Sequence, residues 1–173
     1  MKKAFLLNCV AIALSVGVLE VAKAHGNELH KGSNVYSESD FEQTLWGIGS
    51  LPAKAQRTIK VSLSDNMRFN PSSISVRQGE TIRFVVKNTG AIMHEFVIGT
   101  IEANNEHAQL MKRFPNMQHD APYMAHVAPG ESKEIVWKFN RTGEFQFACL
   151  IAGHYDAGMF GALKVSGPER MTK

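Results

Sequence analysis

The chain has 173 residues, 44% of them hydrophobic and 20% charged, and a net charge of +3. This composition is that of a globular chain with room for one domain or at most two small ones, and it excludes a disordered or fibrous protein. The positive charge is too small and too scattered to indicate nucleic-acid binding. Two cysteines are too few for a disulfide-rich scaffold. The unusual feature is the presence of seven histidines and eight methionines, many in the second half.

The amino terminus has the pattern of a secretory signal peptide. A basic start, Met1-Lys2-Lys3, precedes an apolar run over residues 4–19, and the small-x-small triplet Ala22-Lys23-Ala24 follows. The uncharged run of about 16 residues is shorter than the roughly 20 needed to span a bilayer. We therefore expect residues 1–24 to be removed and the mature chain to be periplasmic, with no membrane span.

Beyond this leader, residues 25–57 are polar and are expected to form a flexible N-terminal extension that docks on the body through one short helical turn. From residue 58 to 173 the chain is expected to form one domain. Its short, alternating, β-like runs predict strands at 58–63, 73–77, 81–87, 94–98, 134–139, 144–149 and 160–165.

An insert interrupts these strands. Residues 101–114 lack a β pattern and predict a helix that ends before Pro115, and residues 117–129 are expected to form a long loop. Seven or so short strands separated by regular turns indicate an all-β sandwich.

The residues that indicate chemistry are Cys149, His154 and Met159, which form a C-x4-H-x4-M motif before the last expected strand. A loop of this length can bring a thiolate, an imidazole and a thioether to one point. A second imidazole is available from His94, at the head of another strand, because strand starts and strand ends share one rim of an antiparallel sandwich. Two histidines and a cysteine with a weak axial methionine are the ligand set of blue copper.

Other interpretations of these residues explain less. A lone cysteine at a strand end is ordinarily a small buried hydrophobe, but Cys149 occurs together with correctly spaced partners. A Cys–His nucleophile pair explains neither Met159 nor the β pattern, and the thioether favours copper over zinc. A copper oxidase or nitrite reductase needs a second copper with an open position, and the sequence has no His-x-His pair. We therefore do not expect an enzyme.

From about Thr58 to Val165 the sequence resembles the cupredoxins, the family of plastocyanin, azurin and rusticyanin. The resemblance implies an eight-stranded Greek-key β-sandwich with one type 1 copper centre, to which this chain adds its helical and loop insert and its extension. It also implies copper-ligand roles for His94, Cys149 and His154, with Met159 as the axial ligand. The ligand spacing is nearer to that of rusticyanin than to that of plastocyanin or azurin.

Three segments of the sequence indicate a smaller group within the cupredoxins. Residues 93–99, the insert with its histidines and methionines, and residues 148–154 are similar to bacterial periplasmic cupredoxins of copper tolerance. This similarity implies that the protein binds, buffers or transfers copper in the periplasm. The alternative is a diffusible one-electron carrier, and the partner would be a copper-transfer or a redox protein. The additional histidines and methionines favour copper tolerance, because a pure carrier does not need them.

The insert holds a candidate second copper site. It contains two Met-x-His pairs, Met117 with His119 and Met124 with His126. Soft thioethers combined with imidazoles suit Cu(I), so we expect these four residues to bind a second copper beside the type 1 centre. The alternative is that the methionines pack in the core and the histidines are solvated.

Two further positions are candidates for copper binding. His107 and Met111 are four residues apart on the expected helix and share a face, although a methionine at this spacing is more often a core residue. Cleavage after residue 24 leaves His25 as the first residue, and a free amine together with its own imidazole can chelate Cu(II).

Overall fold

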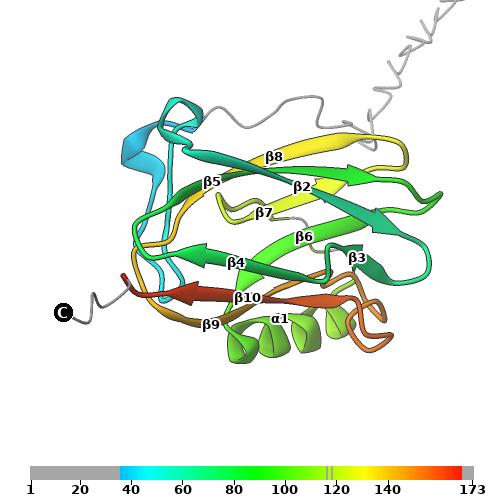
Figure 1. Cartoon of the computed structure of the whole chain (residues 1–173). Helices are drawn as coiled ribbons and strands as arrows, with labels where there is room; N and C mark the ends of the chain where they lie inside the picture. Colours follow the sequence, from blue (N-terminus) through cyan, green and yellow to red (C-terminus); the bar gives the residue numbers. More distant parts are fainter. Residues whose placement is uncertain (1–35, 116, 118, 169–173) are drawn as a thin grey trace, which may run out of the picture. The chain divides into compact units, whose positions relative to one another are not determined.

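The computed structural model describes residues 36–115, 117 and 119–168. The expected signal peptide and residues 25–35, including His25, lie outside the described residues. The described chain folds as two five-stranded β-sheets that face each other, with one α-helix on the outside of the second sheet (Figure 1). This architecture confirms the expected all-β sandwich with a helical insert.

The first sheet contains, in order across it, β1 (Ile48–Gly49), β8 (Ser132–Lys138), β5 (Thr81–Asn88), β2 (Arg57–Ser64) and β3 (Arg68–Asn70). The second contains β4 (Ser73–Arg77), β10 (Phe160–Ser166), β9 (Gly143–Ala148), β6 (His94–Gly99) and β7 (Met124–Val127). Strand β2 pairs with β5 and β4 with β10 in parallel, and all other pairs are antiparallel.

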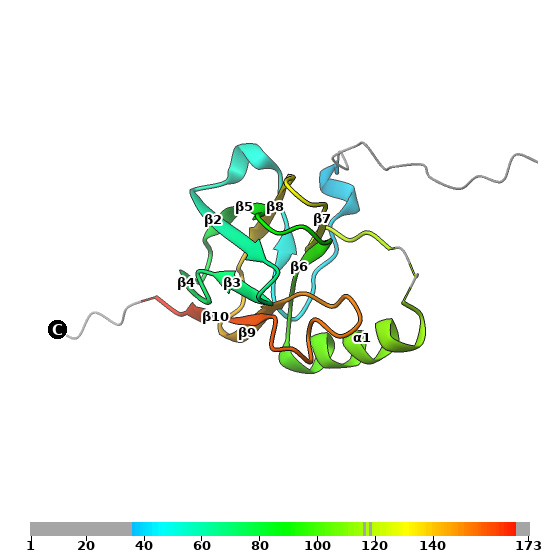
Figure 2. The ribbon, with the colours of Figure 1, turned by 90° about the vertical axis from the view of Figure 1, so that its right-hand side faces the viewer.

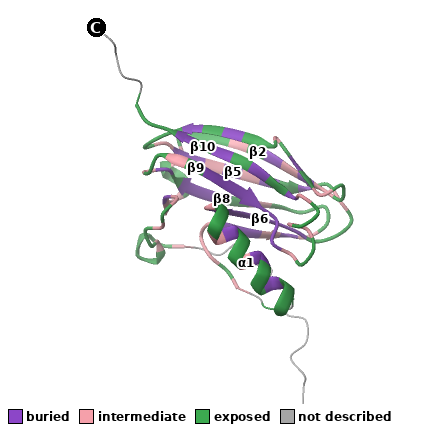
Figure 3. Ribbon diagram, turned by 90° about the horizontal axis from the view of Figure 1, so that it is seen from below, coloured by how far each residue is buried: buried purple, intermediate pink, exposed green. Residues whose placement is uncertain are grey.

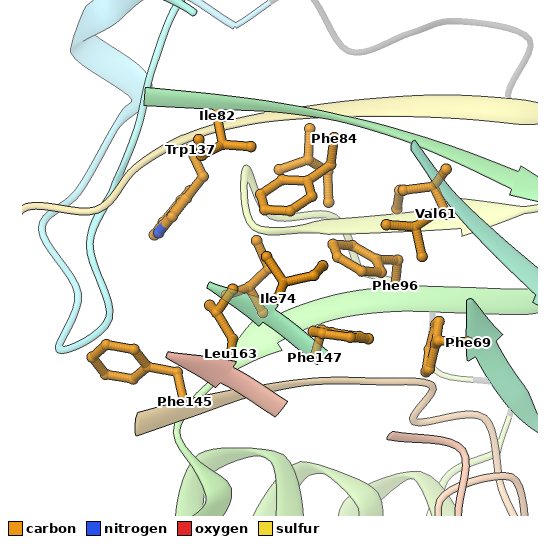
Figure 4. Packing of buried hydrophobic residues seen from close by; sticks show 14 of the residues in the cluster. Val61, Phe69, Ile74, Ile82, Phe84, Phe96, Trp137, Phe145, Phe147 and Leu163 are labelled. Carbon is orange, nitrogen blue, oxygen red and sulfur yellow. The ribbon is translucent and has the colours of Figure 1, made fainter. Parts of the chain in front are cut away.

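Alternation of apolar and polar residues places the core between the sheets. In β4 and β10 every second residue is buried and its neighbours are exposed, which is the pattern of a strand with one face on the core. The core is rich in aromatic rings, several of them in edge-on contact (Figure 4). Edge-on and tilted ring contacts each add about 0.5–1.5 kcal/mol to the hydrophobic stabilisation.

Strand β6 differs from the others because all six of its residues are buried. Phe96 and Ile98 point into the core between the sheets, whereas Val97 packs in a second apolar cluster on the opposite face. The helix α1 (Ile101–Arg113) covers that opposite face with its buried side, which includes Ala108 and Met111 (Figure 3). The insert is therefore what buries the second face of β6.

The chain turns directly from β6 into α1, and two residues fix this turn. The Thr100 side chain accepts a hydrogen bond from the Ala103 backbone N–H at 3.0 Å and so caps the helix. A Cβ atom on Gly99 would lie 2.5 Å from the Asn104 side-chain oxygen, so the close contact of helix and strand requires glycine there.

Part of the expected extension belongs to the sandwich. Besides the short 3-10 helices η1 (Glu38–Asp40) and η2 (Pro52–Lys54), its described residues include β1, which pairs with β8. The Trp46 carbonyl accepts a hydrogen bond from the Trp137 indole at 3.1 Å, and this contact attaches the segment to the core.

One expectation about the insert is wrong: residues 124–127 are not loop but strand β7, which pairs with β6. Ala125 and Val127 face the core, whereas Met124 belongs to the apolar cluster under α1. Alternation is present here, but both faces are covered and one of the residues is a histidine, so the segment has no clear polar face. No helix in the described part of the chain is long and apolar enough to cross a membrane.

Removing the cap of α1 should destabilise the protein without altering the copper site expected from the sequence. Thr100→Ala should lower the free energy of unfolding by about 1 kcal/mol, because the first turn of α1 loses its side-chain acceptor. Thr100→Ser keeps the hydroxyl and should lose much less. Urea denaturation of the two variants tests this, and an equal loss in both would show that the hydroxyl is not what stabilises the turn.

Candidate metal centre

The four residues predicted as ligands come from two segments, the start of β6 and the connection between β9 and β10, which lie at the same end of the sandwich (Figure 2). His94 is the first residue of β6, Cys149 directly follows β9, and Met159 directly precedes β10. His154 lies in the loop between these last two strands. The ligand atoms of His94, Cys149 and His154 all lie within 4.8 Å of one another, and within the described residues this is the one such group of histidine, cysteine or acidic side chains.

Backbone hydrogen bonds hold the β9–β10 loop in shape. The Cys149 N–H donates to the Met159 carbonyl at 3.0 Å, and the Met159 N–H donates to the His154 carbonyl at 3.0 Å. Arg68 on β3 donates to the Ala157 carbonyl at 3.0 Å, and the Tyr155 hydroxyl is 3.0 Å from the Gln146 side-chain oxygen. The loop is therefore attached to both sheets, and three predicted ligands are tied together through their own backbones.

His94 has one nitrogen engaged and one unpartnered. Its Nε2 lies 3.0 Å from the Asp65 carboxylate, and its side chain is fully buried. Its Nδ1 is also buried, and no described residue gives it a hydrogen bond. A buried polar atom without a partner costs free energy, and a metal bound at Nδ1 removes that cost. The carboxylate fixes the tautomer in which Nδ1 carries the lone pair.

The cysteine is placed in surroundings that disfavour a bare thiolate. Burial raises the pKa of the Cys149 thiol to about 12, although the Glu95 backbone N–H donates to its sulfur at 3.3 Å. At neutral pH the metal-free protein therefore holds a thiol, and a cation must displace the proton to bind there. Its sulfur is 3.2 Å from His154 Nδ1.

His154 completes the convergent set as a neutral imidazole. Burial, and next the adjacent His94, hold the pKa of His154 below its usual value, so the ring is available as a ligand at neutral pH. Met159 is fully buried in the same core cluster as Cys149. Two imidazoles and a thiol within reach of one ion, next to a loop that also carries a buried methionine, fit copper by the chemistry of the donors.

The structure does not gather the second predicted set as four ligands. His119 and His126 lie near each other, with ring centroids 6.2 Å apart. Met124, however, packs in the apolar cluster under α1, and Met117 is exposed. The ring of His107, which was not included in that set, is nearer to His119 than the ring of His126 is, with ring centroids 4.5 Å apart.

Two carboxylates beside the centre were missed by the sequence reasoning. Asp65 lies in a turn, and nothing in its local sequence indicates a contact with a residue 29 positions away. Glu95 did carry a signal: it is an acidic residue inside an apolar strand, and it is 2% exposed. Its carboxylate accepts the Leu150 backbone N–H at 3.3 Å and lies 2.9 Å from His126 Nε2.

Comparison with known proteins agrees with a copper-binding site. The profile of copper binding proteins of the plastocyanin/azurin family matches residues 55–166. The copper-resistant cuproprotein CopI of Rubrivivax gelatinosus is 45% identical over 159 residues, which are 92% of this chain and 94% of that protein. CopI of Pseudomonas aeruginosa is 37% identical over 149 residues, with 69% of this chain and 82% of that protein covered.

Among solved structures, auracyanin B aligns with a TM-score of 0.57 at 23% identity, over 69% of this chain and 96% of that one. The reduced auracyanin of Roseiflexus castenholzii aligns with a TM-score of 0.56 at 24% identity, over 65% of this chain and 98% of that one. At this identity the two structures establish the shared fold.

Removing the carboxylate behind His94 should weaken metal binding. Asp65→Ala should lower copper affinity 10- to 100-fold, the usual effect of losing the partner that orients a ligating histidine. Asp65→Asn retains an oxygen acceptor and should lose less. Competition against a chelator of known affinity measures both, and the melting temperature of the metal-free variants reports the separate loss of the Ala91 N–H contact to Asp65. Unchanged affinity in Asp65→Ala would contradict the orienting role.

Proposed function

Because the chain belongs to the plastocyanin/azurin family of copper binding proteins, we propose that His94, Cys149 and His154 would hold its copper ion, with Met159 as a fourth and weaker ligand. The observation that carries this assignment is that one ligand atom from each of these three residues lies within 4.8 Å of the other two. In addition, Nδ1 of His94 is buried and has no hydrogen-bond partner among the described residues. Copper bound there supplies a one-electron couple between Cu(II) and Cu(I).

The protein's own groups prepare the place for either oxidation state. Asp65 and the folded β9–β10 loop hold both imidazoles, and the Glu95 N–H supports negative charge on the sulfur. Apolar side chains on β6 and β9 exclude water from the inner side. A preformed and largely buried set of ligands keeps the structural change between the two oxidation states small, and it lets the thioether and the hydrogen bonds to sulfur set the potential.

We place this chemistry in copper tolerance: the protein would bind, buffer or transfer copper in the periplasm. Two observations support this proposal. Relatives at 45% and 37% identity are named copper-resistant cuproproteins, and residues 1–24 have the pattern of a secretory signal peptide. A non-enzymatic role fits the burial of His94, Cys149 and Met159, because catalysis at a metal needs an open coordination position.

One observation keeps electron transfer as a second candidate. Apolar side chains that flank the ligands in sequence are exposed: Ile92 and Met93 before His94, and Phe160 after Met159. Exposed apolar residues beside a partly exposed His154 would suit brief docking of a redox or copper-transfer protein. Deletion of the gene distinguishes the two functions. A protein of copper tolerance leaves copper-sensitive cells when it is lost, whereas loss of an electron carrier stops a defined electron-transfer chain.

Replacement of the cysteine should remove the centre. Cys149→Ser should abolish the intense visible thiolate-to-copper charge-transfer band, because the sulfur-to-copper bond is its source. In cells lacking the native gene, the same variant should fail to restore growth at high copper. A retained band would contradict the ligand assignment, whereas loss of the band with full tolerance would contradict the proposed role of this centre.

Replacement of the methionine should leave a coloured but altered centre. Met159→Leu keeps the volume nearly constant and exchanges a donor for a purely apolar side chain. An apolar surrounding disfavours the more highly charged Cu(II), so the visible band should remain and the reduction potential should rise. Voltammetry measures this change. Leu163→Met, at a buried position elsewhere in the core, is the matched control and should leave the potential unchanged. An unchanged potential in Met159→Leu would show that the thioether is not a ligand.

A further inference from the structure

Three histidines from three different segments meet on the outer face of the second sheet. His107 lies on α1, His126 lies on β7, and His119 lies in the segment between them. Ring centroids are 4.5 Å apart for His107 and His119 and 6.2 Å apart for His119 and His126. The corresponding distance in the first centre, between His94 and His154, is 5.1 Å. The imidazoles of this second cluster are thus spaced like a pair that can share a metal.

His119 is the residue that points to a ligand. Both of its ring nitrogens are buried, and neither has a hydrogen-bond partner within the described part of the chain. An imidazole always carries at least one N–H donor, and leaving such polar atoms unpaired away from water costs about 1–3 kcal/mol each. Packing alone gives no reason to hold the ring there, because an apolar side chain would fill the space without that cost.

His126 repeats the arrangement of His94. Its Nε2 is 2.9 Å from the Glu95 carboxylate, and its Nδ1 faces the Asp120 carboxylate at 3.8 Å. A ligating histidine usually gives its second N–H to a carboxylate, which fixes the tautomer and strengthens the remaining nitrogen as a donor. Glu95 does this for His126 as Asp65 does for His94, and it leaves Nδ1 of His126 directed toward Asp120.

We propose that His107, His119 and His126 bind a second copper ion, as Cu(II), with Glu95 orienting His126 and Asp120 supplying negative charge at the site. This site differs from the Met-and-His set expected from the sequence, because imidazole and carboxylate donors replace the thioethers of Met117 and Met124. Nitrogen and oxygen donors suit Cu(II), whereas the expected thioethers suited Cu(I). The ligand nitrogens are less tightly gathered than in the first centre, so binding would draw the His119 ring toward its neighbours.

Glu95 connects this second site to the first centre. Its carboxylate contacts His126 and the Leu150 N–H, while its own backbone N–H donates to the Cys149 sulfur. The two sites therefore share one buried residue but no ligand. Substitutions at the three histidines can remove the second ion without touching the residues proposed to hold the first, so the failure of one proposal can be told from the failure of the other.

The test starts from the mature protein with its first centre filled with one equivalent of copper, and adds Cu(II). Three single variants, His107→Ala, His119→Ala and His126→Ala, are compared with the wild-type chain and with Gln109→Ala, a control on the exposed side of the same helix. Bound metal is counted after desalting, and electron paramagnetic resonance follows Cu(II) with nitrogen ligands. Copper held elsewhere, such as at His25, is common to all chains and cancels in the comparison.

We expect each histidine variant to bind one copper less than the wild type and Gln109→Ala, with the visible band unchanged. Met117→Ala should keep the full number, because its exposed thioether is not a ligand. Metal-free His119→Ala should melt no lower than the wild type, because its ring nitrogens have no protein partner to lose, and added Cu(II) should raise its melting temperature less.

Equal copper binding in all chains would overturn the proposal. It would also be overturned if the lost copper were always accompanied by loss of the visible band, because the ion would then belong to the first centre. Loss of an equivalent in Met117→Ala would overturn the thioether-free ligand set in favour of a mixed thioether site.

Discussion

Strand β6 is buried on both of its faces, and this burial positions the elements packed around it. The sandwich core covers one face of the strand that begins with His94, and α1 covers the other. This double burial also encloses the charged side chain of Glu95. A buried carboxylate is costly unless it is paired and hydrogen-bonded, and His126 and the Leu150 N–H provide these partners. Strand β6 thus contacts α1, β7 and the β9–β10 loop, and it fixes their positions relative to one another.

The larger part of the fold could be predicted from the sequence, because strands such as β4 and β10 alternate buried and exposed residues and turn residues separate the short apolar runs. The seven expected strands all occur, and the expected helix ends within one residue of its predicted boundary. The failures share a physical cause. In β7 both faces are covered and the one polar position is a histidine, so its alternation shows no clear polar face, and the two- and three-residue strands β1 and β3 are too short to show a period. The pairing of β1 and β7 also depends on residues far away along the chain, because Ile48 pairs with Lys138 and Val127 with His94.

At the centre, the sequence predicted the candidate ligands but not the groups that support them. A fixed spacing reveals Cys149, His154 and Met159, because one loop holds all three. Asp65 contributes through tertiary contact alone, since the parallel β2–β5 pairing brings the turn after β2 to the start of β6. The insert shows the same limit: Met-x-His pairs are visible in the sequence, but only the fold shows that Met124 faces an apolar cluster and that His107 approaches His119.

The enclosure of Cys149 has a consequence for the protein after it has lost its metal. Oxidants and disulfide exchange act on thiolates that they can reach, whereas this side chain is 0% exposed and its thiol pKa is about 12. The sulfur of an emptied molecule is therefore shielded from sulfenic acid formation and from coupling to a second chain. Such a molecule needs no reductase before it can accept copper again. In the oxidising compartment proposed for this protein, a copy that had lost its copper would therefore keep a sulfur able to bind the ion again.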